Sequence, residues 1–319
     1  MVRNYAGMLA VLAGLVAASM ALALLLGNGS LDWPRSGVDW RVVVDIRLPR
    51  AIAALVTGGL LALAGTLMQV LLRNPLADPY VLGVSGGASA FTLAGMLLGA
   101  AALTLELLAF AGALCSTVIV FVLGRGAGPW STARMLLTGV VVAAGWGAVI
   151  TLLLALGDDR SLRGMLFWLM GDLSYARLSP IWLLVLAGAT GLLMLRARSL
   201  NILSAGETQA ALLGESPRRR YTELYIAAAA LTAVAVSIAG TIGFVGLVVP
   251  HLMRLVVGAD HRRLLPAAAL FGGAFLLVAD TLARNVFSPR QVPVGVLTAL
   301  IGVPLFLLLL NRGARRDDG

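Results

Sequence analysis

The chain has 319 residues, of which 60% are hydrophobic and only 12% are charged, and its mean hydropathy is +0.95. An average soluble protein is about 25% charged, so a soluble enzyme with this composition could not cover its own surface. The net charge of +9 comes from arginines that lie between long apolar runs, which is typical of membrane topology rather than nucleic-acid binding, and we predict an all-α polytopic membrane protein.

The residue types that carry chemistry are sparse. All 24 basic residues are arginine, so the chain lacks the lysine that a Walker A loop or a Schiff base requires. The two histidines, His251 and His261, form no HExxH motif, and the single cysteine, Cys115, lies in an apolar run. We therefore predict a non-enzymatic chain with no disulfide, no metal site and no bound cofactor.

Ten apolar runs predict about ten transmembrane helices in a single domain, 1–319. The first run could be a secretory signal peptide, but its roughly 22 residues exceed the 7–15 of a signal's apolar region, so we interpret it as a membrane helix. The eighth run is too short to cross alone, because a helix rises 1.5 Å per residue and needs about 20 residues. The predicted spans are Ala6–Gly27, Ala51–Leu72, Val81–Leu98, Leu103–Leu123, Met135–Leu156, Ile181–Leu195, Leu224–Gly240, Gly243–Val257, Ala267–Leu282 and Val294–Leu310.

Ten spans place both termini on one side of the membrane. In that topology 15 arginines fall on the side of the termini and nine on the other, which together account for all 24. The positive-inside rule then predicts that both termini are cytoplasmic. The nine outer arginines need a separate reason, either contact with lipid headgroups or a partner protein.

Three polar segments are long enough to be structured. Residues 28–50, on the predicted outer side, end in Arg47-Leu-Pro-Arg50. Residues 157–180, also outside, have apolar residues at helical spacing, which predicts a short helix at the interface. Residues 199–220, inside, read as short helices broken at Gly206 and near Gly214. This last segment is the only plausible cytoplasmic docking platform.

Glycines concentrate in the predicted spans. Gly58, Gly59 and Gly65 have the spacing that lets helix backbones approach closely. The runs 83–87 and 240–246 fit the same packing role, or else they interrupt helices beside a transport pathway. The first of these runs is not a nucleotide loop, because it lacks the GxGxxG pattern and follows no strand.

Ionisable residues at membrane depth are few. Asp280, in the ninth span, is the deepest candidate, and Glu106 lies near an interface. An intramembrane carboxylate is a functional candidate by default, but Asp280 can equally pair with Arg284, four residues along the helix. A secondary transporter with inverted repeats would need more such groups for ion coupling. We therefore predict an energy source on another chain and find no support for an intramembrane enzyme or a channel.

Several motifs then occur in a fixed order. They are Arg47-Leu-Pro-Arg50, Gly65-Thr-Leu-Met-Gln69, Arg73-Asn-Pro-Leu-Ala-Asp-Pro-Tyr-Val-Leu-Gly-Val-Ser-Gly-Gly-Ala88, Gly240-Thr-Ile-Gly-Phe-Val-Gly-Leu-Val-Val-Pro-His-Leu-Met-Arg254, Asp260-His-Arg-Arg-Leu-Leu-Pro266, Ala279-Asp-Thr-Leu-Ala-Arg284 and the run from Val292 to Gly302. Over residues 40–311 the set resembles the FecCD-type permeases of binding-protein-dependent ABC importers for iron–siderophores, heme or cobalamin.

The resemblance implies a type II ABC importer permease fold in the bacterial inner membrane. Its expected partners are a second permease subunit, most simply as a homodimer, two cytoplasmic ATPase subunits that bind ATP-Mg, and a periplasmic substrate-binding protein. The expected function is import of an iron chelate, heme or an iron–siderophore complex, because iron systems are the more numerous branch. Cobalamin import is the alternative within the family, and an ion-gradient-driven secondary transporter is the alternative from another class.

The resemblance also assigns residues to roles. Arg47, Arg50 and Arg284 match arginines that pair with glutamates on the binding protein, where rim charges would steer docking; contact with lipid headgroups is the alternative. Asn74, Leu76, Ser131 and Thr132 match the cytoplasmic gate. Ala210, Leu213 and Gly214, within 201–217, match the helices that contact the ATPase. Gln291 departs from the family's glutamate, which leaves the roles of Gln291 and Arg290 open.

Overall fold

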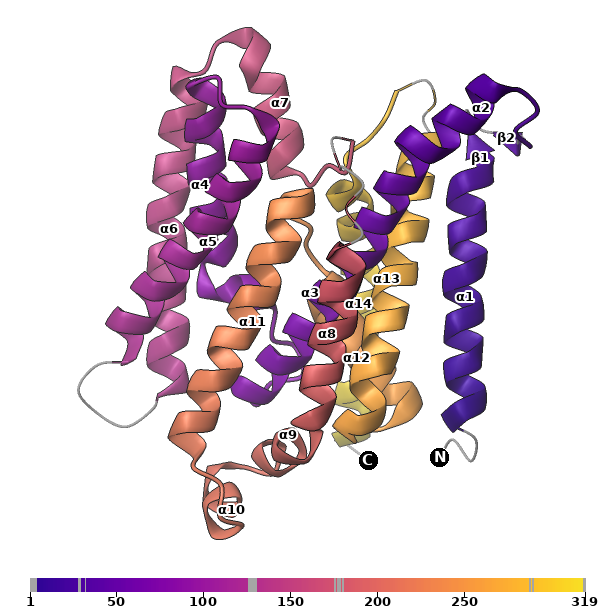
Figure 1. Cartoon of the computed structure of the whole chain (residues 1–319). Helices are drawn as coiled ribbons and strands as arrows, with labels where there is room; N and C mark the ends of the chain where they lie inside the picture. Colours follow the sequence, from indigo (N-terminus) through magenta and orange to yellow (C-terminus); the bar gives the residue numbers. More distant parts are fainter. Residues whose placement is uncertain are drawn as a thin grey trace.

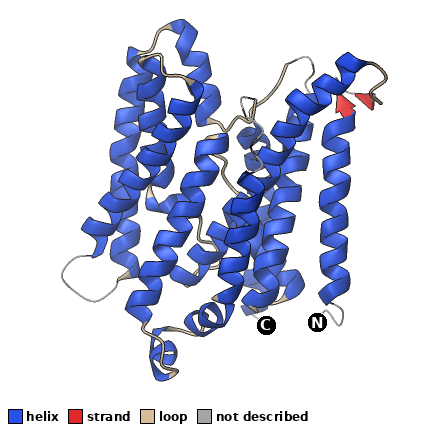
Figure 2. Cartoon of the chain, viewed as in Figure 1, coloured by secondary structure: helices blue, strands red, loops and turns tan. Residues whose placement is uncertain are grey.

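The computed structural model describes residues 5–27, 30–31, 33–125, 131–174, 176, 179, 181–286, 288 and 290–317. The parts of the predicted segments 28–50 and 157–180 at residues 28–29, 32, 175, 177–178 and 180 lie outside these ranges. The described chain is helical apart from one antiparallel pair of two-residue strands (Figures 1 and 2). The elements are α1 Tyr5–Leu25, β1 Leu26–Gly27, β2 Ser30–Leu31, α2 Gly37–Arg41, η1 Val42–Arg47, α3 Leu48–Leu71, η2 Pro79–Leu82, α4 Val84–Leu97, α5 Ala102–Arg125, α6 Thr132–Leu156, α7 Asp159–Leu169, α8 Ile181–Leu195, α9 Ala197–Ser204, α10 Glu207–Leu212, α11 Pro217–Ala239, α12 Val245–Val257, α13 His261–Asn285 and α14 Val294–Asp317.

Every predicted span is a helix, which confirms the all-α membrane fold. Six helices of the described chain are long and apolar enough to cross a bilayer: α1, the continuous Gly37–Leu71 helix, α5, α6, α11 and α13. The α8–α9 pair, bent by 60°, makes a seventh if it counts as one span. Helices α4, α12 and the apolar part of α14 are shorter, so by length alone the structure gives six or seven crossings where the sequence predicts about ten.

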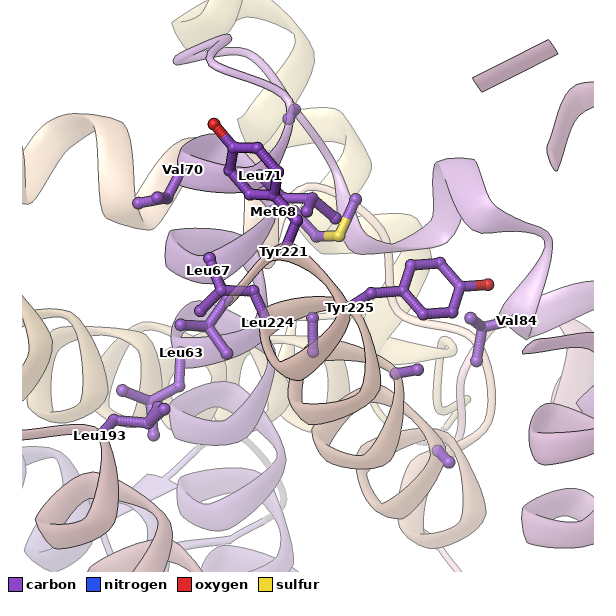
Figure 3. Close-up of a cluster of buried hydrophobic side chains, with 14 of the residues drawn as sticks. Leu63, Leu67, Met68, Val70, Leu71, Val84, Leu193, Tyr221, Leu224 and Tyr225 are labelled. Carbon is purple, nitrogen blue, oxygen red and sulfur yellow. The ribbon is translucent and has the colours of Figure 1, made fainter. Parts of the chain in front are cut away.

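Helix α3 is the centre of the molecule. Nearly all of its residues are buried, whereas α6 buries only Met135 and Gly139, and α3 packs against α8, α11, α12 and α13. Close approach depends on glycine, because a Cβ at Gly65 would overlap the carbonyl oxygen of Gly246 in α12. Figure 3 shows the side chains of α3 interleaved with those of α11. The labelled residues are Leu63, Leu67, Met68, Val70 and Leu71 of α3, Val84 of α4, Leu193 of α8, and Tyr221, Leu224 and Tyr225 of α11.

Two of the glycine-rich runs do interrupt helices. Gly83 adopts a left-handed conformation (φ 70°) directly before α4, although the rest of that run lies inside the helix. Between α11 and α12, Gly240 (φ 67°) and Phe244 (φ 69°) are both left-handed. One backbone group of this break that has no helical partner, the amide of the buried Ile242, donates a hydrogen bond of 3.1 Å to the Tyr80 hydroxyl.

The helix that carries Arg47 and Arg50 begins earlier than the sequence predicts. We placed its start at residue 51, but helical structure begins at Gly37. A capping box explains the difference, because the Ser36 hydroxyl accepts a hydrogen bond from the Asp39 amide, and the Asp39 carboxylate accepts one from the Ser36 amide, satisfying two otherwise unpaired donors. The chain then continues through the π-helical segment η1 into α3 without a break.

The molecule has two distinct ends. Helices α9 and α10 lie at the end where the N- and C-termini are marked, at the bottom of Figure 1, and α2, β1–β2 and α7 lie at the other; we call these the α10 end and the α7 end. Helices α9 and α10, with left-handed breaks at Gly206 and Gly214, confirm the predicted helices of 199–220. Helix α7, capped by the Asp158 side chain on the Ser161 amide at 2.9 Å, confirms the short helix of 157–180.

Candidate functional site

The predicted site residues separate between the two ends of the molecule. The α7 end holds Arg47, Arg50 and Arg284, and the α10 end holds Asn74, Leu76, Ser131, Thr132, Ala210, Leu213 and Gly214. One helix, α3, connects the two groups, since it begins directly after Arg47 and ends two residues before Arg73. A rigid-body movement of α3 would therefore displace residues in both groups.

Arg50 is the most constrained of the predicted docking residues. It is only 6% exposed, and its Nε and Nη2 atoms donate to the Asp280 carboxylate at 2.8–3.0 Å. Its Nη1 atom donates to Ser174 at 2.9 Å and to Gln291 at 3.0 Å. The guanidinium thus joins α3, α13 and the segments that follow α7 and α13, and it gives Gln291 a structural partner.

The other two arginines hold the end of α1. Arg47 Nη1 donates to the carbonyl oxygen of Leu24 at 2.7 Å, and Arg284 Nη2 donates to that of Ala23 at 3.2 Å. Arg284 Nε also lies 3.3 Å from the Asp280 carboxylate. The predicted Asp280–Arg284 pair is therefore present, but the shorter bonds of Asp280 go to Arg50.

The structure corrects the expectation of exposed rim arginines. Arg50 is buried and the Arg284 side chain is only 12% exposed, because both guanidinium groups pair with Asp280 inside the bundle. Arg47 is half-buried. The docking role remains a prediction for all three residues, and in this conformation Arg50 could meet a partner only after leaving Asp280.

The predicted gate residues lie in two local turns at the α10 end. The Asn74 side chain accepts a hydrogen bond of 2.9 Å from the Leu76 amide, which fixes the proline-rich turn after α3. Ser131 caps α6, since its hydroxyl accepts a hydrogen bond of 3.3 Å from the Arg134 amide, and Thr132 is the first residue of that helix. Element η2, which follows the Asn74 turn, packs against α6, so the two turns belong to neighbouring parts of the bundle.

The predicted coupling residues divide into an exposed and a buried set. Leu213 is 66% exposed and Gly214 is also exposed. Ala210, in contrast, is fully buried in the core cluster beneath α10, so it supports the helix rather than meeting a partner. Leu212, which is not among the predicted site residues, is 83% exposed. It forms with Leu213 an apolar tip at the end of α10. Both leucines lie directly before the glycine that ends the helix, and this position is the signal in the sequence that could have identified them.

A hydrogen-bonded group of Asn201, Asp260 and His261, which we call the Asn201 latch, joins α9 to the start of α13. Helix α9 belongs to the predicted segment 199–220, which we call the coupling segment. The Asn201 amide nitrogen donates to the Asp260 carboxylate at 2.7 Å. The Asn201 carbonyl oxygen accepts from the His261 backbone amide at 2.9 Å and lies 2.6 Å from His261 Nδ1. His261 is buried. Sequence spacing could not bring these residues together, because they lie about 60 positions apart.

An apolar groove opens beside the break between α11 and α12. It has a volume of about 580 Å³ and is lined by the end of α7, by Thr241, and by α14 from Gly295 to Pro304. The Thr241 hydroxyl donates to the carbonyl oxygen of Leu169, which ties the break to α7. None of the described residues that line the groove is ionisable, so it suits passage of a large apolar surface better than coordination of an ion.

Comparisons with known proteins agree with this architecture. The sequence profile described as the FecCD transport family matches residues 5–312. The hemin transport system permease protein of Yersinia pestis is 42% identical over 305 residues, covering 90% of this chain and 89% of that protein. The Fe(3+) dicitrate transport system permease FecD of Escherichia coli is 40% identical and covers 88% of each chain. The vitamin B12 import system permease of Vibrio vulnificus is 41% identical and covers 92% and 90%.

A solved structure shares the whole fold. It is described as an inward-facing conformation of a putative metal-chelate type ABC transporter, and it is 30% identical to this chain with a TM-score of 0.87. The match covers 96% of this chain and 99% of that one. The short helices α4 and α12 therefore belong to a recurring architecture.

Proposed function

This chain belongs to the FecCD transport family and is an ABC importer permease of the iron-chelate, heme or cobalamin class. We propose that its cargo is an iron chelate, either heme or an iron–siderophore complex. The relatives named for hemin and ferric dicitrate support this choice. Cobalamin is the alternative cargo, supported by the similar identity to the vitamin B12 permease.

The observation that carries the importer proposal is the exposed tip of α10. Leu212 and Leu213 project from the α10 end, and exposed adjacent leucines at a helix end are typical of a contact with another protein. The partner we propose is a cytoplasmic ATPase subunit that binds ATP-Mg. Hydrolysis must occur on that separate chain, because this chain has no lysine for a Walker A loop.

The orientation follows from the same assignment. The α10 end and both termini face the cytoplasm of the inner membrane, and the α7 end faces the periplasm, where a substrate-binding protein docks. Arg47, which unlike Arg50 and Arg284 forms no ion pair with Asp280, is the first of the three to meet that protein. Two copies of this chain form the permease, with the cargo path between them, and the groove at Thr241 forms part of its wall.

We propose a mechanism of alternating access. Docking at the α7 end displaces the start of α3, while ATP binding moves α10 and, through the Asn201 latch, α13. Both movements reach the turns at Asn74, Leu76, Ser131 and Thr132, which open and close the cytoplasmic exit. Substrate specificity can reside in the binding protein, so the path itself needs no tight cargo site.

The test is purification of the tagged chain in mild detergent with mass spectrometry of co-eluting proteins. We expect a stoichiometric partner that carries a Walker A lysine. In proteoliposomes of that complex, binding proteins loaded with hemin or a ferric siderophore should stimulate ATP hydrolysis more than one loaded with cyanocobalamin. The opposite order would transfer the cargo assignment to cobalamin.

A secondary transporter is the contrasting function. It would move solute on an ion gradient without an ATPase. Asp280, the one carboxylate among the buried residues of the described ranges, is neutralised by Arg50 and Arg284 and is poorly placed to exchange protons or cations. Transport by the lone chain in liposomes with an imposed ion gradient, and none with ATP and a partner, would refute the importer proposal.

A further inference from the structure

Arg254, in the last turn of α12, forms no ion pair with any described residue. Its Nε atom is buried and has no hydrogen-bond partner, and its Nη2 atom makes one long hydrogen bond of 3.3 Å to Gln69 of α3. Buried guanidinium groups are normally paired with an anion or fully hydrogen-bonded. This incomplete pairing points to a missing acceptor.

A second arginine lies at the same place. Arg73 and Arg254 line one small cavity at the α10 end together with Gln69, Val70, Pro75 and Ser204. The cavity has a volume of about 110 Å³, room for roughly three or four waters at about 30 Å³ each. It is large enough for one small oxyanion and far too small for a metal chelate or heme.

The charges around this cavity do not balance. In the described part of the chain, ion pairs involve only Arg50, Arg219, Arg220 and Arg284; neither Arg73 nor Arg254 takes part in one. The C-terminal ends of α3 and α12 lie nearby, and each contributes roughly half a negative charge. The two arginines carry two positive charges and the two helix ends together supply about one negative charge, so about one positive charge is left uncompensated.

The available donors identify the kind of ligand. The Ser204 hydroxyl donates its one hydrogen to the carbonyl oxygen of Leu200. The Gln69 amide nitrogen donates one of its two hydrogens to the carbonyl oxygen of Leu247, which leaves it one hydrogen for a ligand. The guanidinium groups of Arg254 and Arg73 supply the remaining donors. Forked guanidinium donors match the paired oxygens of a phosphate group in geometry and charge.

We propose that this cavity binds a phosphate group, either free phosphate or the headgroup of an anionic phospholipid. A bound phosphate would join Arg73, in the turn after α3, to Arg254 at the end of α12, in a cavity that Ser204 of α9 also lines. The site needs neither cargo nor ATPase, so its test is independent of the proposed function.

The experiment uses the full chain, purified in mild detergent and delipidated. Binding of radiolabelled inorganic phosphate is measured by equilibrium dialysis, and phosphatidylglycerol retention is measured by native mass spectrometry. The variants are Arg254→Gln and Arg254→Lys, with Arg198→Gln, an exposed arginine of α9, as the matched control. Thermal unfolding in phosphate-free buffer shows whether each variant is folded.

We expect Arg254→Gln to bind about ten- to a hundredfold more weakly, the loss typical of one charge-assisted hydrogen bond. Arg254→Lys should fall between it and wild type, and Arg198→Gln should bind as wild type does. Binding of phosphate itself identifies the free ion, whereas retention of phosphatidylglycerol without phosphate binding identifies the lipid.

Equal binding by wild type and Arg254→Gln, or an equal loss in the control, would overturn the proposal. Absence of both ligands from the wild type would do the same. If Arg254→Gln does not fold, Arg73→Gln takes its place, because the Arg73 side chain is exposed and its removal leaves no hole in the core. The expected loss of phosphate binding is the same, about ten- to a hundredfold.

Discussion

Several polar residues in this bundle join helices that are distant in sequence. Arg50 is the clearest case, because one guanidinium bonds to Asp280, Ser174 and Gln291, between 124 and 241 positions away. Breaking such a buried pair costs more than the pair contributes, since the remaining charge is left buried without a partner. The same three contacts explain why a residue that the sequence predicts to dock with a partner is not exposed.

The Arg50–Asp280 pair gives the first prediction. Arg50→Ala and Asp280→Ala should each destabilise the protein by about 3–5 kcal/mol. Arg50→Ala leaves the Asp280 carboxylate with only its 3.3 Å contact to Arg284, and Asp280→Ala leaves both arginines without their carboxylate. The double variant should cost less than the sum of the two, which a double-mutant cycle of detergent-solubilised protein would measure. Arg290→Ala, at an exposed neighbouring arginine, is the control and should have little effect. Additive single effects would show that the pair is not coupled.

At the scale of elements, close helix contacts and short capped helices set the architecture. Helices α3 and α12 touch through backbone, at Gly65 and Gly246, which a side chain at either position would prevent. Helix α9 is held to α13 by the side chain of Asn201. The first contact fixes the distance between two helices, and the second joins the coupling segment to the transmembrane bundle.

The α3–α12 contact predicts that Gly65→Ala is destabilising. The new methyl group would overlap the Gly246 carbonyl, and over-packing of this kind typically costs about 1–3 kcal/mol. Gly147→Ala is the matched control: a Cβ there meets nothing within 4 Å, so the higher helix propensity of alanine should leave the protein equally or more stable. Thermal unfolding in detergent compares the two, and an unchanged midpoint for Gly65→Ala would contradict the contact.

The Asn201 latch predicts uncoupling. Asn201→Ala removes hydrogen bonds to Asp260 and His261, so α9–α10 should loosen from α13 and become more sensitive to limited proteolysis. In the reconstituted complex, ATP hydrolysis should continue while transport falls at least severalfold. Thr208→Ala, exposed on α10, is the control. Full transport in Asn201→Ala would exclude the latch from the coupling path.

The latch also has a pH dependence. The hydrogen bond from the Asn201 side chain and that from the Arg262 amide lower the pKa of Asp260, so its carboxylate favours the folded state. This stabilisation is complete above the unfolded pKa of about 3.9 and is lost as the pH falls through the lowered native pKa. In Asn201→Ala the pKa of Asp260 should rise toward its ordinary value, which carboxyl-selective ¹³C NMR would detect.

At the scale of the whole molecule, the two ends have different surfaces joined by one buried helix. The α7 end gathers arginines around Asp280, and the α10 end presents the leucines of α10, with α3 running between them. Because α3 is enclosed by α8, α11, α12 and α13, a shift at one of its ends cannot be absorbed locally by lipid-facing side chains. This arrangement suits a subunit that links events on the two faces of a membrane.

The exposed tip predicts a partner contact. Replacing Leu212 and Leu213 by serine should reduce co-purification of the ATPase at least tenfold, because the substitutions remove the apolar surface while leaving the buried Ala210 in place. The isolated permease should keep its thermal stability. Leu195→Ser, another exposed leucine near the α10 end, is the control. Equal recovery of ATPase with wild type and the double variant would place the contact elsewhere.

The sequence by itself determined the helical membrane class, the order of the apolar helices, the breaks at Gly206 and Gly214, and the family. These properties follow from apolar runs, glycine and proline positions, and local motifs, all of which act over a few residues. The sequence also predicted an Asp280–Arg284 pair, because the two residues share a helix face.

Only the tertiary structure decided which polar groups are buried together. Arg50 meets Asp280, and Asn201 meets Asp260, across separations that no local pattern encodes. Ala210 turned out to support α10 from beneath, while its neighbour Leu212 is exposed. The physical reason is that the neighbouring helices decide which face of a short helix is covered. In the same way, the incomplete pairing of Arg254 can be recognised only from the side chains that surround it in the folded chain.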